Sequence, residues 1–366
     1  MYLPFSTPGQ MVAELRAAAP ADALWLLCLS DRHGEALAEL LAALRAGGLR
    51  ACGGIFPGLI QGGRLQDAGL VAVPLPAASR ATVAELAPAE VRWRGAPPEV
   101  PAGQAASAYL FVDCLAPNIT GFLEGVFDRY GSRLSHVGAG AGYRDLRREP
   151  ALFTEAGLLI DGALLIVTPQ AATVQVRHGW TRIEGPFVAS RTRGNVIEEL
   201  NWEPAGSFYR RLVGAHQPQW AGKPIFPDVV ASFPLCIGKD GGEDVMRDPV
   251  GVNDADELVV LSHVSENSVM YLAHGDRASL VAAARQAVDD CGDPAGVVRC
   301  FVSDCYSRAR FLADGFDAEL DAVADAVARF ADVAPEGVLA LGEIAANGRS
   351  SIEFFNKTIV VGLTHG

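Results

Sequence analysis

Apolar residues along the chain fall in short runs separated by turn residues, with amphipathic stretches between some of the runs. Short runs rich in Leu, Val, Ile and Phe and bounded by turn residues are typical of buried strands. We expect strands at 23–30, 49–56, 69–75, 109–114, 158–167, 174–176, 187–190, 229–237, 244–247, 257–261, 268–272, 296–302 and 337–341. Two last runs, 351–355 and 358–363, are expected to form a hairpin that turns at Asn356-Lys357.

Helical spacing of apolar residues marks a smaller set of segments. In 35–46 the leucines fall on one face, and a pair of glycines follows as a helix end. Asn118 is a typical N-cap for a helix that runs to Tyr130. Further helices are expected at 277–290 and 307–330, and the Ala- and Pro-rich stretch 77–101 is expected to hold a short helix and a surface connection.

Several predicted strands follow one another without a helix between them. A doubly wound parallel sheet would alternate strands and helices, so mixed and antiparallel sheets fit better. Prolines in 217–227 block both a helix and a central strand, which makes this segment the best boundary. We therefore expect an α/β (α+β) protein of two lobes, with mixed, largely antiparallel sheets covered by helices. The domains would be 1–216 and 228–366, with 217–227 as the linker.

The amino-acid composition excludes a disordered chain and argues against nucleic acid and membranes as partners. The chain has 366 residues, of which 50% are hydrophobic and 20% charged, and a formal net charge of −13. These values exclude a disordered chain, which needs low hydrophobicity and many charges. The 30 Lys and Arg residues are scattered and form no basic stripe. We therefore expect no nucleic acid and no membrane as a partner, and no apolar run reaches the roughly 20 residues that span a bilayer.

Cysteine usage bears on the compartment. The seven Cys residues have no C-x-x-C spacing, and most lie in or beside apolar runs. This pattern is typical of reduced, buried thiols. Together with the acidic charge and an N-terminal segment unlike a signal peptide, it predicts a cytoplasmic protein. His and Cys residues show no metal-ligand spacing, so no metal site is predicted.

A series of short motifs resembles one protein family. The motifs are HVGAGAGYRD at 136–145, ALFTEAG at 151–157, DGALLIV at 161–167, HGW at 178–180, GNVIEEL at 194–200, VMRD at 245–248, VRCFVSDCYSR at 298–308, GEI at 342–344 and FNKT at 355–358. From about residue 21 to 363, their order and spacing resemble a FIST-domain protein. The FIST N part would be 1–216 and the FIST C part 228–366.

This resemblance implies a sensory module of intracellular signal transduction that binds a small-molecule ligand. Amino-acid-like ligands are proposed for the family, and some members are similar to haem-based gas sensors. We recognise no kinase, cyclase or DNA-binding segment, so a signalling partner protein supplied in trans is expected. One position departs from the family, because Leu339-Ala340-Leu341 precedes GEI where an aromatic residue is common. If that aromatic lines the pocket, the ligand here differs.

Cys305 and Arg308 are the first candidate site residues. A helix that starts near Ser303 or Asp304 would place Cys305 in its first turn, beside free backbone N–H groups, with Arg308 on the same face. Such an arrangement suits a carboxylate or another anion. The structural alternative is a small packing residue and an arginine paired with a nearby acid. The family resemblance favours the ligand-binding role.

Glu343, Arg247 and Asn356 complete the candidate ligand site. Glu343 follows an apolar run, and a buried carboxylate needs a cation or several N–H donors. Its partner is either Arg247 or Arg308 in a structural ion pair, or the ammonium group of a ligand. An arginine and Glu343 acting together would read the two charges of an amino acid. Asn356 in the predicted turn is a further ligand contact, although asparagine also suits turn geometry.

Two other functions remain open at this stage. Haem held without a covalent link needs only one axial histidine, and His178 beside Gly179-Trp180 is the best candidate. Cys305 is the one nucleophile that an acyl- or amide-transforming enzyme could use, but no local histidine base accompanies it. The sequence leaves open whether the protein is an enzyme.

Overall fold

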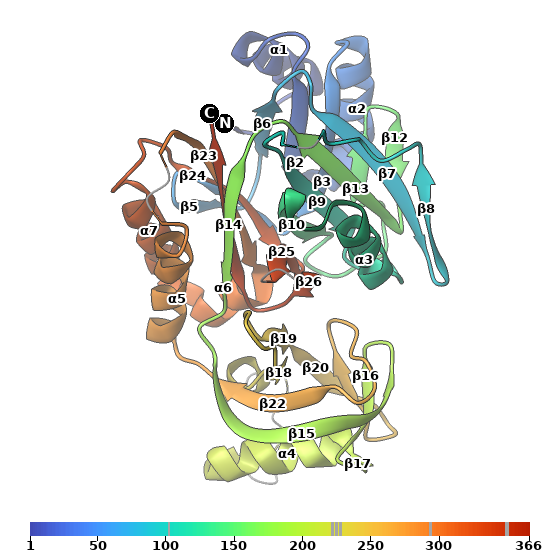
Figure 1. Ribbon diagram of the computed structural model, residues 1–366, viewed down its shortest axis with the longest axis vertical. Helices are drawn as coiled ribbons and strands as arrows, with labels where there is room; N and C mark the ends of the chain where they lie inside the picture. The colour runs from blue at the N-terminus through green and yellow to red at the C-terminus, as the bar shows by residue number, and fades with distance from the viewer. Residues whose placement is uncertain (102, 221–222, 224–225, 227–228, 293–294, 348–350) are drawn as a thin grey trace.

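Two lobes stack along the long axis of the molecule (Figure 1). The computed structural model describes residues 1–366 except 102, 221–222, 224–225, 227–228, 293–294 and 348–350. The larger lobe contains three sheets and both ends of the chain, and the smaller lobe contains one sheet and a helix. The expected α/β class, with two lobes of mixed, largely antiparallel sheets, is confirmed.

The first sheet of the large lobe carries two helices on its outer face. In spatial order its strands are β1 (Tyr2–Leu3), β6 (Leu70–Leu75), β2 (Leu24–Ser30), β3 (Arg50–Phe56), β11 (Leu152–Thr154) and β12 (Gly157–Leu159). The helices are α1 (Pro8–Ala18), which the sequence analysis did not predict, and α2 (Leu37–Ala46). Strand β2 is apolar from Leu24 to Leu29 because Trp25 and Leu27 face these helices while Leu26 and Cys28 face the centre of the lobe.

The second sheet joins strands from both ends of the chain. Its order is β26 (Ser351–Phe355), β25 (Glu343–Asn347), β10 (Ser135–Ala141), β9 (Ser107–Asp113), β13 (Gly162–Thr168), β7 (Arg80–Ala87) and β8 (Glu90–Arg94). Helix α3 (Ile119–Tyr130) packs against it. The predicted cap of this helix is confirmed, since the Asn118 side chain accepts a hydrogen bond of 3.2 Å from Gly121 N.

The third sheet lies beside the remaining helices of the large lobe. Its order is β14 (Ala172–Arg177), β27 (Ile359–His365), β23 (Val297–Cys305), β24 (Pro335–Ala340), β4 (Gly58–Gln61) and β5 (Arg64–Gln66). Helices α5 (Arg277–Asp289), α6 (Tyr306–Leu312) and α7 (Phe316–Val327) contribute to its core. The three sheets enclose a shared apolar core that includes Phe56, Phe111 and Phe301.

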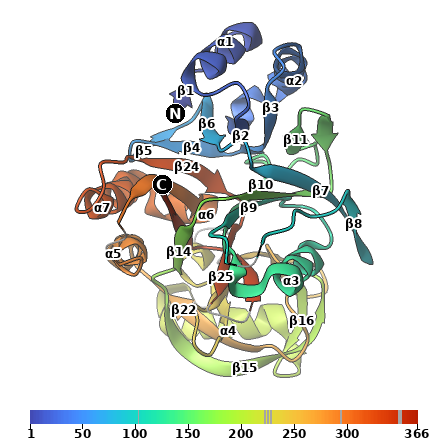
Figure 2. The same cartoon turned by 45° about the horizontal axis from the view of Figure 1, so that its top comes forward.

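The small lobe is one antiparallel sheet with its own core. Its order is β19 (Val245–Arg247), β18 (Leu235–Ile237), β22 (Val269–His274), β15 (Thr181–Arg193), β16 (Val196–Leu200), β21 (Leu258–Val260) and β20 (Pro249–Val252), and β17 (Glu203–Pro204) pairs with β16. Helix α4 (Ala205–His216) packs on this sheet through Phe208, Tyr209 and Val213. The long strand β15 curves under the lobe in Figures 1 and 2.

The two halves expected from the sequence, 1–216 and 228–366, interleave in space. Strands from both sides of 217–227 share three of the four sheets formed by the described residues. For example, β14 pairs with β27, and β10 pairs with β25. The expected linker itself lies partly outside the described residues, which there include only 217–220, 223 and 226.

Several predicted elements differ from the structure: 229–237 contains η4 (Val230–Ser232) and only the short strand β18, and the expected helix 307–330 is divided into α6 and α7. Two further differences change the topology. The stretch 77–101 contains the hairpin β7–β8 and no helix, because β7 pairs along its length with β13 and this pairing outweighs the helix preference of alanine. The expected hairpin of 351–355 and 358–363 is also wrong. Strand β26 pairs with β25, whereas β27 pairs with β14 and β23 in another sheet. The chain between them crosses from one sheet to the other.

Candidate functional site

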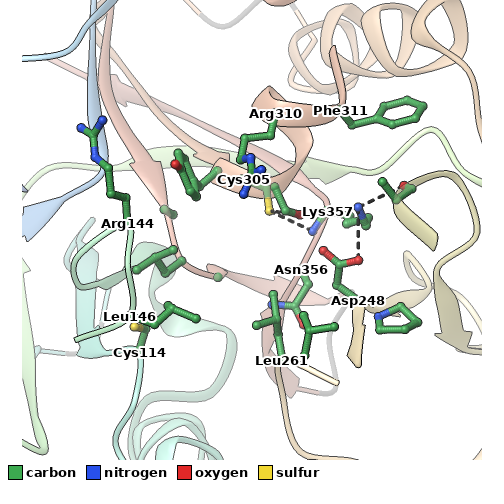
Figure 3. Close-up of a pocket in the computed structure, with 18 of the residues that line it drawn as sticks. Cys114, Arg144, Leu146, Asp248, Leu261, Cys305, Arg310, Phe311, Asn356 and Lys357 are labelled. Carbon is green, nitrogen blue, oxygen red and sulfur yellow. Dashed lines mark hydrogen bonds and ion pairs between the residues drawn. The ribbon is translucent and has the colours of Figure 1, made fainter. Parts of the chain in front are cut away.

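A cavity of about 490 Å³ lies where the two lobes meet (Figure 3). On the large-lobe side it lies beyond the carboxyl ends of β9, β10, β23 and β24, which form two parallel pairs. On the small-lobe side it meets the loops around β20 and β21. Its lining residues are Cys114, Leu115, Arg144, Leu146, Val230, Ala231, Asp248, Pro249, Val250, Leu261, Cys305, Tyr306, Ser307, Arg310, Phe311, Ala340, Leu341, Gly342, Asn356 and Lys357.

The crossover between β26 and β27 forms part of the cavity wall. Lys357 has a left-handed backbone (φ 57°), which turns the chain from one sheet to the other. Its ammonium group is buried and lies 3.2 Å from Asp248 Oδ1 and 3.2 Å from the Ala231 carbonyl oxygen, both in the small lobe. Asn356 beside it accepts a 2.9 Å hydrogen bond from Ser262 Oγ. The crossover therefore ties the two lobes together at the cavity.

Cys305 lines the cavity at the start of α6. The strand β23 continues to Cys305 and the helix begins at Tyr306, so the helix starts two to three residues later than expected. The sulfur accepts a 3.2 Å hydrogen bond from Lys357 N and lies 3.4 Å from Ser307 Oγ. Burial, reinforced by the Glu343 carboxyl, raises the pKa of this thiol to about 12. Cys305 is therefore a neutral thiol at physiological pH.

Glu343 lies behind the cavity wall and is fully buried. Its Oε2 accepts hydrogen bonds from Thr358 N (3.1 Å) and Thr358 Oγ1 (2.7 Å), while Oε1 has no hydrogen-bond partner among the described residues. Burial raises the pKa of this carboxyl to about 8, against the opposing effect of the Thr358 hydrogen bonds. Because its pKa lies above 7, Glu343 is mostly protonated at neutral pH, and no ion pair joins it to Arg247 or Arg308 among the described residues.

Arg308 belongs to a buried network behind α6, not to the cavity. Its Nε donates to Glu319 Oε1 at 2.6 Å, and Nη2 donates to the Leu280 carbonyl at 2.7 Å. Nη1 donates to the carbonyl oxygens of His178 and Lys357. The side chain is completely buried. Because its donors are used within the protein, Arg308 matches the structural alternative.

Arg247 is also held by the protein and lies outside the cavity lining. Its Nε donates to the His263 carbonyl at 2.9 Å, and Nη1 donates to the carbonyls of Met246 (2.9 Å) and Phe354 (3.3 Å). Burial lowers the pKa of the guanidinium to about 10. The bond to Phe354 is a further link between the lobes.

His178 does not fit the axial ligand of a haem. The residue is buried at the junction of β14 and β15 and does not line the cavity. Its Nδ1 accepts a 2.8 Å hydrogen bond from Trp180 N, and its Nε2 lies 3.5 Å from Glu243 Oε1. Desolvation lowers the pKa of the imidazole, which makes it a neutral hydrogen-bonding group. The cavity lining contains no histidine among the described residues.

Sequence reasoning missed several charged residues of the cavity. Asp248 and Lys357 line the cavity and stand within the quoted motifs VMRD and FNKT, and this motif position was the signal that could have found them. Arg144 is the second-last residue of the first motif and pairs with Asp31 through hydrogen bonds of 2.7 and 2.8 Å. Nothing in the sequence marks Arg310 as a cavity residue, because an arginine on a helix is usually a solvated charge.

Two family models cover most of the chain. Residues 22–203 match the FIST N domain, and residues 205–346 match the FIST C domain. The chain belongs to the FIST family. FIST domains are associated with signal transduction and small-ligand sensing. No curated protein matches this chain.

The FIST assignment gives the cavity a position in the family architecture. Its walls come from both matched regions, with Cys114 and Arg144 from FIST N and Asp248 and Cys305 from FIST C. Asn356 and Lys357 follow the FIST C match along the chain and complete the lining. No helix among the described residues has the length and apolar character needed to cross a bilayer.

Proposed function

We propose that this FIST protein is an intracellular, cytoplasmic sensor that binds a small polar metabolite in the cavity between its lobes. The observation that carries the proposal is the composition of the wall, because both lobes supply residues to it. A volume of about 490 Å³ suits a small metabolite. A ligand there contacts the groups that hold the lobes together, so binding changes the balance between lobe arrangements.

The lobes are linked in a way that suits such a response. Two chain segments join them, one between β14 and β15 and one between β22 and α5. Noncovalent links across the junction include Lys357–Asp248 and the hydrogen bond from Ser262 to Asn356. Two crossing segments and a lined cavity are the parts of a hinge-type sensor. The output passes to a signalling partner protein that recognises the changed lobe arrangement.

An enzyme that uses Cys305 is less well supported. A nucleophilic cysteine needs a lowered pKa or an adjacent base. Here burial raises the thiol pKa to about 12, and no histidine is found among the described lining residues. A haem-based sensor is also less well supported. The two ring nitrogens of His178 lie against Trp180 N and Glu243, so neither faces a space that could hold a haem iron.

Thermal unfolding with a metabolite panel tests the proposal. A ligand at about 100 times its Kd adds about 2.7 kcal/mol of apparent stability. We expect at least one metabolite to stabilise the wild type but not Ala231→Trp, whose indole fills the cavity from η4 (Val230–Ser232). A panel that shifts neither protein, or shifts both equally, contradicts binding in this cavity.

A further inference from the structure

Several side chains of the cavity lining carry hydrogen-bond donors that no described residue accepts. Arg310 on α6 lines the cavity, and its side chain points toward it in Figure 3. No hydrogen bond or ion pair joins its guanidinium to any residue that the structure describes, whereas the nearby Arg308 donates to four acceptors. A guanidinium has five N–H donors and no acceptor. Arg310 is exposed to solvent, so its unmatched positive charge is accessible to a ligand.

The crossover adds two further donors. The Asn356 side chain is almost fully buried, and its Oδ1 is already used by Ser262. Its Nδ2 has no hydrogen-bond partner within the described part of the chain. Lys357 uses two of its three N–H bonds on Asp248 and the Ala231 carbonyl. Groups that only donate require a ligand group that accepts.

The charges around the cavity leave one positive charge without a protein partner. Arg144 is balanced by Asp31, and Lys357 is balanced by Asp248. Arg310 is the remaining charge among the described lining residues. A single unmatched cation suits a ligand group that carries one negative charge, such as a carboxylate, better than a phosphate monoester of about −1.5 to −2.

A ligand ammonium group has no comparable place in the cavity. Asp248 is the one acidic residue among the described residues of the lining, and its Oδ1 already pairs with Lys357. An ammonium at Asp248 would stand beside the Lys357 ammonium, and like charges at short range repel. Glu343 behind the wall faces Thr358 with one oxygen and is protonated at neutral pH.

Most of the other lining residues are apolar. Aliphatic and aromatic residues from both lobes contribute to the lining. They are Leu115, Leu146, Val230, Val250, Leu261 and Phe311. Burial of apolar surface contributes about 25 cal/mol per Å² to binding. The wall therefore favours a ligand with an apolar body.

We propose that the cavity binds a small apolar carboxylic acid in its carboxylate form, and that Arg310 receives the carboxylate. This inference rests on the proposed sensory function and narrows its ligand class. It distinguishes the ligand from an amino acid, whose ammonium group would need an acidic partner. Asn356 and Lys357 line the same cavity and supply further N–H donors.

Calorimetric titration of the intact protein with three matched probes tests the inference. The probes are octanoate, 2-aminooctanoate and octylamine, which share a chain length and differ in charge. We expect octanoate to bind most tightly and octylamine least. Arg310→Gln is expected to weaken octanoate binding about ten- to hundredfold, the range for a lost charge-assisted hydrogen bond. Arg310→Lys retains the charge, so its affinity for octanoate is expected to lie between those of the wild type and Arg310→Gln.

The control is Arg92→Gln, an exposed arginine on β8 outside the cavity lining, which should bind octanoate like the wild type. Binding of octylamine or 2-aminooctanoate at least as tight as that of octanoate overturns the inference but leaves a ligand-binding cavity. Equal octanoate affinity in wild type and Arg310→Gln also overturns it. No binding of any probe overturns the ligand class, whereas the sensory function fails only if the metabolite panel also shifts nothing.

Discussion

Glu343 makes the stability of the protein depend on pH at the level of one residue. Burial raises the pKa of its carboxyl from its ordinary value of 4.5 to about 8. The folded state then holds a proton that the unfolded state releases, so the stabilising contribution is complete below about pH 4.5 and is lost as pH rises toward 8. Glu343→Gln cannot lose this proton.

We therefore expect the stability of Glu343→Gln relative to the wild type to increase between about pH 4.5 and 8. Urea unfolding at several pH values measures this difference directly. The matched control is Glu39→Gln, which alters an exposed carboxyl on α2. A Glu343→Gln difference that stays flat with pH, like that of the control, contradicts a protonated Glu343.

Cys305 gives a second prediction at the residue scale. Because burial raises its thiol pKa to about 12, we expect native Cys305 to resist iodoacetamide at pH 7–8. The same residue should react readily once the protein is unfolded in urea. Peptide mass spectrometry after timed alkylation measures both rates. Rapid labelling of native Cys305 at pH 7 would contradict the neutral thiol and revive a catalytic role.

Single candidate residues were partly predictable from the sequence. Cys305 and Asn356 line the cavity. The sequence pointed to Cys305 through its motif and to Asn356 through its place in a predicted turn. Arg308 and Arg247 turn inward, and a sequence does not show whether backbone carbonyls are available to a buried guanidinium. Arg310 was missed for the opposite reason, since only the small lobe opposite α6 makes it part of a cavity.

Helix α6 contains two arginines with opposite roles, Arg308 and Arg310. We expect Arg308→Ala to destabilise the protein by about 3–5 kcal/mol, because it leaves the buried Glu319 without its cation. Arg310→Ala on the same helix should change stability by less than about 0.5 kcal/mol. Chemical denaturation of both variants makes the comparison. Equal losses in the two variants would contradict this division of roles.

At the level of elements, local apolar patterns predicted most helices and strands, but they did not predict which strands pair with one another. The helix after Asn118 and most strands agree with the apolar pattern. The stretch 77–101 was misassigned because β7 pairs with β13, a strand far along the chain that local sequence does not reveal. The ends of β26 and β27 are close in sequence, yet distant strands draw them into different sheets.

The arrangement of the whole molecule depends on the junction between the lobes. Removing the charge of Asp248 leaves the Lys357 ammonium buried without its counterion. We expect Asp248→Asn to lower stability by about 3 kcal/mol and to speed hydrogen–deuterium exchange on both sides of the junction, in 245–252 and 354–358. Exchange resolved by mass spectrometry checks this.

The control for the junction is Glu203→Gln, which removes an exposed ion pair with Arg211 within the small lobe. Exposed pairs of this kind contribute little, so exchange at the junction should not change. If Asp248→Asn leaves the exchange of both segments at the wild-type rate, the pair with Lys357 does not hold the lobes together.

The interleaving of the chain explains why the site as a whole escaped prediction. The cavity wall combines strand ends near 114 and 144 with loops near 248, 305 and 356. These segments come together because three of the four sheets formed by the described residues combine strands from distant parts of the chain. Neither apolar periodicity nor motif order contains that information.

A crystal structure of the protein with the tightest binder from the titrations tests the central claim most directly. We predict ligand density in the cavity between α6, the Asn356-Lys357 crossover and Leu261, with an anionic group at the Arg310 guanidinium. Density for the ligand elsewhere on the molecule, with this cavity empty at saturating concentration, would contradict the account.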